Sequence, residues 1–120
     1  MKRLLRSFLY AFSGIAQAIK TQRSMRIHLF AAVFAIIMGL VTRLTPVEWA
    51  IIILLIGLVL AFECLNTTIE ATLDRQSTEY HPLTRIAKDA AAGAVLIMAI
   101  TSVAVGLIIY INALLRLLGW

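Results

Sequence analysis

The chain has 120 residues, of which 62% are hydrophobic and only 14% are charged. Together with an unbroken, uncharged run from residue 90 to residue 111, this composition excludes a soluble globular domain and predicts one integral membrane domain. The formal net charge of +5 would suit nucleic acid, but the basic residues gather on one side of the predicted membrane helices, so we expect no nucleic-acid partner. The single cysteine excludes an intramolecular disulfide.

Residues 1–22 are predicted to form an amphipathic helix. Their apolar side chains recur at helical spacing and form one stripe, made of Leu4, Leu5, Phe8, Leu9, Phe12, Ile15 and Ile19. Four basic side chains lie outside this stripe: Lys2, Arg3, Arg6 and Lys20. A basic amphipathic helix ahead of membrane spans is typical of a segment that lies in the membrane interface, and packing against the rest of the protein is compatible with this placement.

Three membrane helices are predicted, over residues 27–42, 47–72 and 84–115. The first is short, so we expect Arg23 and Arg26 to anchor it at the interface. Pro46 suits the first turn of the second helix, where the missing N–H costs no helical hydrogen bond. Thr84 is the predicted N-cap of the third helix. The small residues from 90 to 94 favour close packing against other helices.

The basic residues predict an orientation. With the N-terminus inside, nine of the eleven lysines and arginines lie on the cytoplasmic side, and only Arg43 and Arg116 lie outside. The same orientation places the acidic residues between 62 and 89 on the cytoplasmic side, where ATP and magnesium are available.

Acidic residues concentrate in one stretch, because residues 62–89 hold five of the six in the chain. Four polar residues within it are spaced to share one helical face, hereafter the polar face: Glu63, Asn66, Glu70 and Asp74. Glu63 follows Val47 by sixteen residues, or about 24 Å of helix, against a hydrocarbon thickness of roughly 30 Å. The polar face should therefore begin just inside the membrane and emerge from it.

Two interpretations of the polar face are open. It can be a solvated helix end with ordinary surface charges, or it can be a functional site. Three carboxylates on one face repel each other unless a cation lies among them, and Lys88 and Asp89 could complete such a cluster. Because ionisable groups entering a membrane helix indicate a functional site by default, we favour the second interpretation.

The residues in and after the polar face resemble those of a known family. The runs E-C-L-N-T-T-I-E-A-T-L-D-R, E-Y-H-P-L and A-K-D-A-A-A-G-A-V-L, which begin at Glu63, Glu79 and Ala87, are similar to the small bacterial lipid kinases. These are the prokaryotic diacylglycerol kinases and the undecaprenol kinases. The resemblance covers nearly the whole chain and implies an all-α homotrimeric bundle in the bacterial inner membrane, with active sites between subunits.

The resemblance also implies an activity and a set of site residues. It implies ATP- and Mg²⁺-dependent phosphorylation of a membrane lipid hydroxyl, with Glu63 as the general base beside the lipid and Glu70 as a metal ligand. Asn66 and Lys88 would hold phosphates. The remaining members of the implied nucleotide region are Asp74, Glu79, Tyr80, His81 and Asp89. Tyr10 would lie near the nucleotide and Arg3 near the lipid.

One position departs from the family pattern. The segment before the first span usually carries a glutamate, and in undecaprenol kinases it reads roughly E-R-N-x-x-x-H, where this chain has Gln22, Arg23, Ser24 and His28. Gln22 is thus the implied metal and nucleotide ligand, but it offers Mg²⁺ a neutral oxygen without a charge. We expect weaker metal binding, or help from another carboxylate.

The proposed chemistry suits these residue types. Phosphoryl transfer depends on positioning and charge neutralisation, which carboxylate-bound Mg²⁺ and a lysine supply. The sequence has neither a Walker A run nor a glycine-rich kinase loop. We expect undecaprenol as the acceptor, with diacylglycerol as the alternative; a small proton-coupled transporter and a non-catalytic scaffold are more distant readings. His81 is interpreted as a nucleotide contact or a loop residue, and His28 as an interfacial or packing residue.

Overall fold

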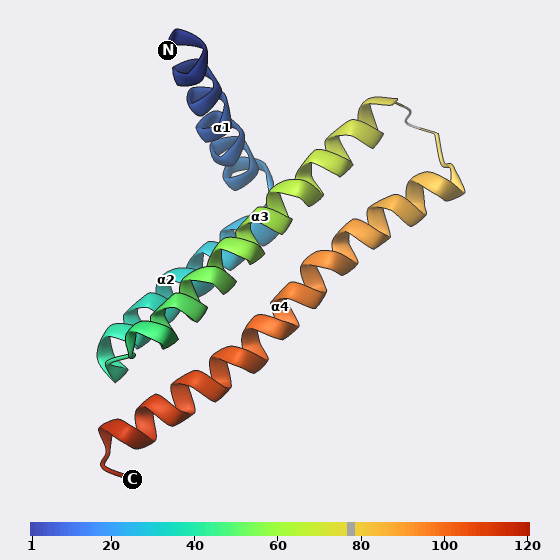
Figure 1. Ribbon diagram of the computed structural model, residues 1–120. Helices are drawn as coiled ribbons and strands as arrows, with labels where there is room; N and C mark the ends of the chain where they lie inside the picture. The colour runs from blue at the N-terminus through green and yellow to red at the C-terminus, as the bar shows by residue number, and fades with distance from the viewer. Residues whose placement is uncertain (77–78) are drawn as a thin grey trace.

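The computed structural model describes residues 1–76 and 79–120 and, over those ranges, consists of helices joined by short connections, with no strand. It has four helices: α1 (Lys2–Thr21), α2 (Arg23–Thr42), α3 (Pro46–Gln76) and α4 (Pro82–Leu117). Figure 1 shows α2 and α3 lying side by side, α4 running along α3, and α1 pointing away from the other three. The predicted all-α fold is confirmed.

Three of the helices, α2, α3 and α4, are long and apolar enough to cross a membrane. Large apolar side chains on their outer surfaces are exposed, among them Phe30 at 78% and Ile97 at 66%. In water such exposure would be unstable, whereas in lipid these side chains meet hydrocarbon. An integral membrane protein with three spans, as predicted, is confirmed; the homotrimer stays a prediction.

The junction between α1 and α2 is a single residue. Gln22 is extended, with φ −111° and ψ 116°, and it serves as C-cap of α1 and N-cap of α2. The Arg26 guanidinium donates hydrogen bonds to the carbonyls of Ile19 at 2.9 Å and Lys20 at 3.0 Å, which are among the last of α1. This satisfies carbonyls that a helix end leaves without partners and ties α1 to the first turn of α2.

The turn between α2 and α3 is set by local chemistry. Arg43 ends α2 in the left-handed region, with φ 56°, and the Leu44 amide bonds back to the Gly39 carbonyl at 3.2 Å. Thr45 and Glu48 then form a reciprocal capping box, because each side chain accepts from the other's amide, at 3.2 and 2.9 Å. Pro46 begins α3, as predicted.

The end of the bundle beside this turn, hereafter the turn end, is closely packed. The Trp49 ring lies so near Gly39 that a Cβ on the glycine would approach it to 2.6 Å. A buried cluster joins the turn, α3 and α4, and consists of Leu44, Ile52, Ile109 and Ala113. The Arg116 guanidinium closes this end with a 2.7 Å ion pair to Glu48. The spans are therefore packed against one another and joined by an ion pair at this end.

The start of α4 differs from the prediction. The helix begins at Pro82 and its N-cap is His81, whose Nδ1 accepts from the Leu83 amide at 3.1 Å. Thr84 lies inside the first turn and is not the cap, because Pro82 already supplies a first helical position that needs no hydrogen-bond acceptor. Part of the predicted polar connection before Pro82 lies outside the described residues.

Candidate active site

Glu63 is the most enclosed charged side chain in the described part of the protein, with 1% of its surface exposed. Both carboxylate oxygens are engaged by side chains of α2. His28 Nε2 lies 3.2 Å from Oε1, and the Ser24 hydroxyl donates to Oε2 at 3.0 Å. A buried carboxylate is costly unless hydrogen bonds or a charge compensate it, and these two contacts supply that compensation.

Asn66 and Glu70 follow Glu63 on the same face of α3. Asn66 is 8% exposed, and its Nδ2 lies 3.5 Å from Glu70 Oε1 at the limit of a hydrogen bond. The Asn66 Oδ1 is buried and has no hydrogen-bond partner among the described residues. Buried polar atoms are nearly always satisfied, so this oxygen is available to a ligand, a water or a cation.

The far end of the polar face reaches α4. Lys88 pairs with Asp74, which joins the two helices where α3 emerges from the apolar part of the bundle. Asp89 pairs instead with Arg85 at 3.3 Å, and both of these side chains are largely exposed. Of the predicted polar cluster, the structure shows the contact between Lys88 and Asp74, while Asp89 pairs with Arg85 on the exposed side of α4.

The structure does not gather the remaining predicted residues around Glu63. Tyr10 is 74% exposed on α1, and Tyr80 is 81% exposed before α4. Three others are also exposed: Arg3, Glu79 and His81. Gln22 is half-buried at the junction of α1 and α2. Among residues 1–76 and 79–120, no group of three His, Cys, Asp or Glu side chains lies close enough to hold a metal ion.

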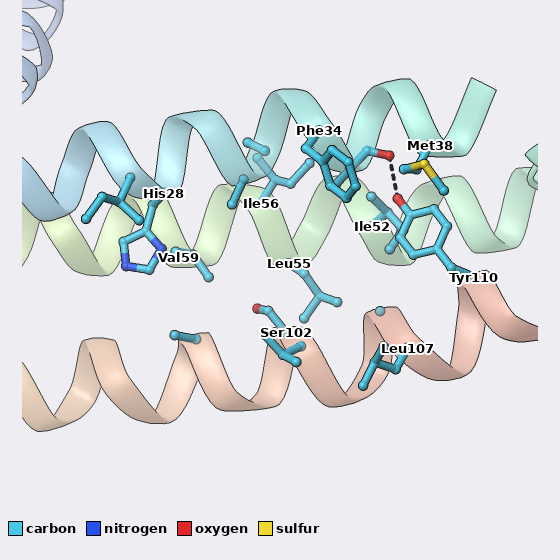
Figure 2. Close-up of a pocket in the computed structure, with 17 residues that line it drawn as sticks. His28, Phe34, Met38, Ile52, Leu55, Ile56, Val59, Ser102, Leu107 and Tyr110 are labelled. Atoms are coloured by element: carbon cyan, nitrogen blue, oxygen red, sulfur yellow. Dashed lines mark hydrogen bonds between the residues drawn. The ribbon is translucent and has the colours of Figure 1, made fainter. Parts of the chain in front are cut away.

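An apolar cavity of about 520 Å³ lies between α2, α3 and α4. Figure 2 shows His28 at one end of it and Tyr110, which donates to the Ala35 carbonyl, at the other. The Ser102 hydroxyl lies in its wall, buried and without a partner in the described structure. Val59 lines the cavity four residues before Glu63 on the same face of α3, and His28 both lines the cavity and contacts the Glu63 carboxylate.

Two residues of the site, Ser24 and His28, were missed by the sequence prediction, which treated His28 as an interfacial or packing residue. They are four residues apart on α2 and so share one face. That spacing was visible in the sequence. What it could not reveal is that this face of α2 meets Glu63, because the rotation of one helix against another depends on the packing of the whole bundle.

Comparison with known proteins identifies the family of the chain. Residues 9–110 match the family described as prokaryotic diacylglycerol kinase. An undecaprenol kinase of Bacillus subtilis is 42% identical over 114 residues, which cover 95% of this chain and 93% of that protein. A diacylglycerol kinase of Synechocystis is 42% identical over 96% of this chain and 66% of its own length, and one of Escherichia coli is 31% identical over 84% and 83%. The chain belongs to the prokaryotic diacylglycerol kinase family.

Proposed function

We propose that this kinase transfers the γ-phosphate of ATP to the hydroxyl of a membrane lipid, with undecaprenol as the preferred acceptor and diacylglycerol as the alternative. The observation that carries the proposal is the buried Glu63 carboxylate, which contacts His28 at 3.2 Å, while His28 itself lines an apolar cavity. A lipid alcohol has the same arrangement, since its single hydroxyl sits at the end of an apolar chain.

In this mechanism Glu63 is the general base. It accepts the proton of the acceptor hydroxyl as that oxygen bonds to the γ-phosphorus, and the bond between phosphorus and the bridging oxygen of ADP breaks. Ser24 and His28 each occupy one carboxylate oxygen, and every carboxylate oxygen has a second lone pair for the incoming proton. The enclosure of Glu63 keeps water from competing with the lipid hydroxyl.

The nucleotide and its Mg²⁺ are assigned to the rest of the polar face. The unpartnered Asn66 Oδ1 beside the Glu70 carboxylate fits a Mg²⁺ ion, which prefers oxygen ligands and usually takes only one or two carboxylates together with phosphates. Glu70 and Gln22, the predicted metal ligands, would hold the ion, whose charge neutralises the phosphates. The unpartnered oxygen of Asn66, which was predicted to hold a phosphate, would be a third ligand. The Lys88 side chain, which pairs with Asp74 in this structure, would exchange that partner for a phosphate. Five further residues are proposed to contact the nucleotide: Asp89, Glu79, His81, Tyr10 and Tyr80. Arg3 is proposed to lie near the lipid.

A homotrimer with shared sites is part of the proposal. Three observations support it. The described part of one chain lacks a three-ligand metal cluster, and the Asp89 side chain is largely exposed. The small residues at the start of α4 leave room for a neighbour, since a Cβ on Gly93 would meet nothing within 4 Å. The excess of basic residues on the α1 side supports a cytoplasmic site at the bacterial inner membrane.

The test is transfer of labelled γ-phosphate by the wild-type protein in mixed micelles with Mg²⁺, with undecaprenol and diacylglycerol measured side by side. We expect label in both lipids and a higher kcat/KM for undecaprenol. A large preference for diacylglycerol would overturn the acceptor assignment, and no label in either lipid would overturn the lipid kinase.

A variant tests the cavity in the same assay. Gly106 lines the cavity, and a Cβ built there meets nothing within 4 Å, so Gly106→Leu should fold while filling part of the space. We expect a higher KM for undecaprenol and an unchanged KM for ATP. Gly57→Leu is the matched control, because this glycine also has open space around it and does not line the cavity. An unchanged lipid KM in Gly106→Leu would remove the cavity from acceptor binding.

A further inference from the structure

We propose that His28, assisted by Ser24, is a positioning residue that fixes the direction in which Glu63 accepts the proton of the acceptor hydroxyl. This inference rests on the proposed function, because it assigns a role within the same reaction. His28 itself touches neither the phosphates nor the metal in this scheme, and it acts only through the carboxylate of Glu63.

The first argument is geometric. Ser24 and His28 lie one turn apart on α2 and hold different oxygens of the same carboxylate, at 3.0 and 3.2 Å. Two hydrogen bonds to two oxygens fix both the position of a carboxylate and the plane in which it lies, whereas one bond would leave it free to rotate. The lone pairs that remain then point in a defined direction, as a general base requires.

The second argument concerns charge. Glu63 is 1% exposed, and in the described ranges its ion-pair partner is His28, with no lysine or arginine within ion-pair distance. A lysine or arginine salt bridge would hold the carboxylate ionised but would also make it a poor proton acceptor. An imidazole that donates from Nε2 orients the carboxylate without contributing a permanent charge.

The third argument is the place of His28 in the bundle. Its imidazole lines the apolar cavity as well as contacting Glu63, and 19% of the side chain is exposed (Figure 2). One side chain therefore lies against both the proposed site of the lipid chain and the base. A residue that only filled space would need no polar atom at this position, and an apolar side chain would serve the cavity better.

The test separates orientation from packing by comparing two substitutions of similar size. His28→Leu keeps the packing and removes the donor, while His28→Gln places an amide N–H close to the position of Nε2. We expect His28→Leu to lower kcat with undecaprenol roughly tenfold or more, with an unchanged KM for ATP, and His28→Gln to recover most of that loss. Phe30→Leu is the control, since Phe30 is exposed on the same helix and does not line the cavity.

The outcomes are distinct. A His28→Leu variant with wild-type kcat, or Leu and Gln variants that lose activity equally while melting like the wild type, would overturn the proposal. If His28→Leu does not fold, His28→Asn replaces it: its shorter amide stops short of Oε1, so a kcat equal to that of His28→Gln would overturn the proposal. A wild-type protein that phosphorylates neither lipid would instead reject the proposed function, and this inference with it.

Discussion

The helix α3 carries an acidic side chain near each end of its apolar part, and the two side chains have different hydrogen-bond partners. At the turn end, Glu48 accepts a backbone amide, pairs with Arg116 and caps its own helix. At the other end, Glu63 is held by two side chains of α2, and one turn further Asn66 keeps a buried oxygen without a partner. The turn end therefore uses its carboxylate for a helix cap and an ion pair, whereas the other end keeps a buried oxygen, that of Asn66, for a ligand.

The substitution Glu63→Gln should have the largest effect and tests the difference between the two ends of α3 most directly. The amide keeps the shape of the side chain and can still accept from Ser24, but it is no longer a base. We expect phosphoryl transfer to fall by roughly 10²–10⁴-fold while the protein stays folded. Transfer of labelled γ-phosphate together with thermal unfolding in detergent measures both. Equal labelling by the wild type and the variant would remove Glu63 from the role of base.

Asn66→Leu should separate stability from activity. The substitution removes a buried oxygen that lacks a partner, at the cost of one long contact of 3.5 Å to Glu70. We expect the free energy of unfolding to rise by about 1 kcal/mol and the transfer rate to fall at least about tenfold. Chemical denaturation and the labelled-ATP assay report the two quantities. A variant that is both less stable and fully active would show that this oxygen has a structural partner rather than a ligand.

Gln22→Glu sharpens the metal assignment. A carboxylate at the junction of α1 and α2 would add a charge to a site where Gln22 offers only a neutral oxygen. We expect the Mg²⁺ concentration that gives half-maximal activity to fall by roughly threefold or more, while the KM for the lipid changes little. Gln76→Glu is the matched control, because Gln76 is exposed at the end of α3. The same shift in both variants would indicate general electrostatics and not a ligand.

The smallest expected effect is at the turn end. Glu48→Gln weakens the pair with Arg116 and the capping box, so the free energy of unfolding should fall by about 1 kcal/mol. We expect kcat and both KM values to stay at wild-type levels. Arg116→Gln leaves the capping box intact, so it should lower the free energy of unfolding by less than Glu48→Gln does. A change in kcat for Glu48→Gln at a temperature where the protein is folded would contradict the contrast between the two ends.

Much of this architecture could be predicted from the sequence, because it depends on local rules. Apolar runs identify membrane helices in any context, and the spacing of Glu63, Asn66 and Glu70 places them on one face of any α-helix. The start of α4 was placed wrongly at Thr84 because a histidine is a less usual cap than a threonine, and only the fold shows the bond from the Leu83 amide to His81.

Contacts between helices could not be predicted in this way. His28 and Ser24 approach Glu63 only at one rotation of α2 and one displacement of α2 along α3. The α2–α3 turn and the packing of Trp49 on Gly39 help to determine both. The polar face could be predicted as a candidate site, but the two residues that contact Glu63 belong to another helix. The residues before α4 remain predictions for the nucleotide region.

The single extended residue between α1 and α2 has a mechanical consequence. Because Arg26 bonds two of the last carbonyls of α1, rotation of that helix about Gln22 against the start of α2 is restrained. In a membrane, α1 would follow the height and slope of the surface on which it lies, and Gln22 would move with it. Membrane thickness and lateral tension would then alter the position of a residue proposed to hold the metal, so the bilayer itself would help to set the rate of the enzyme.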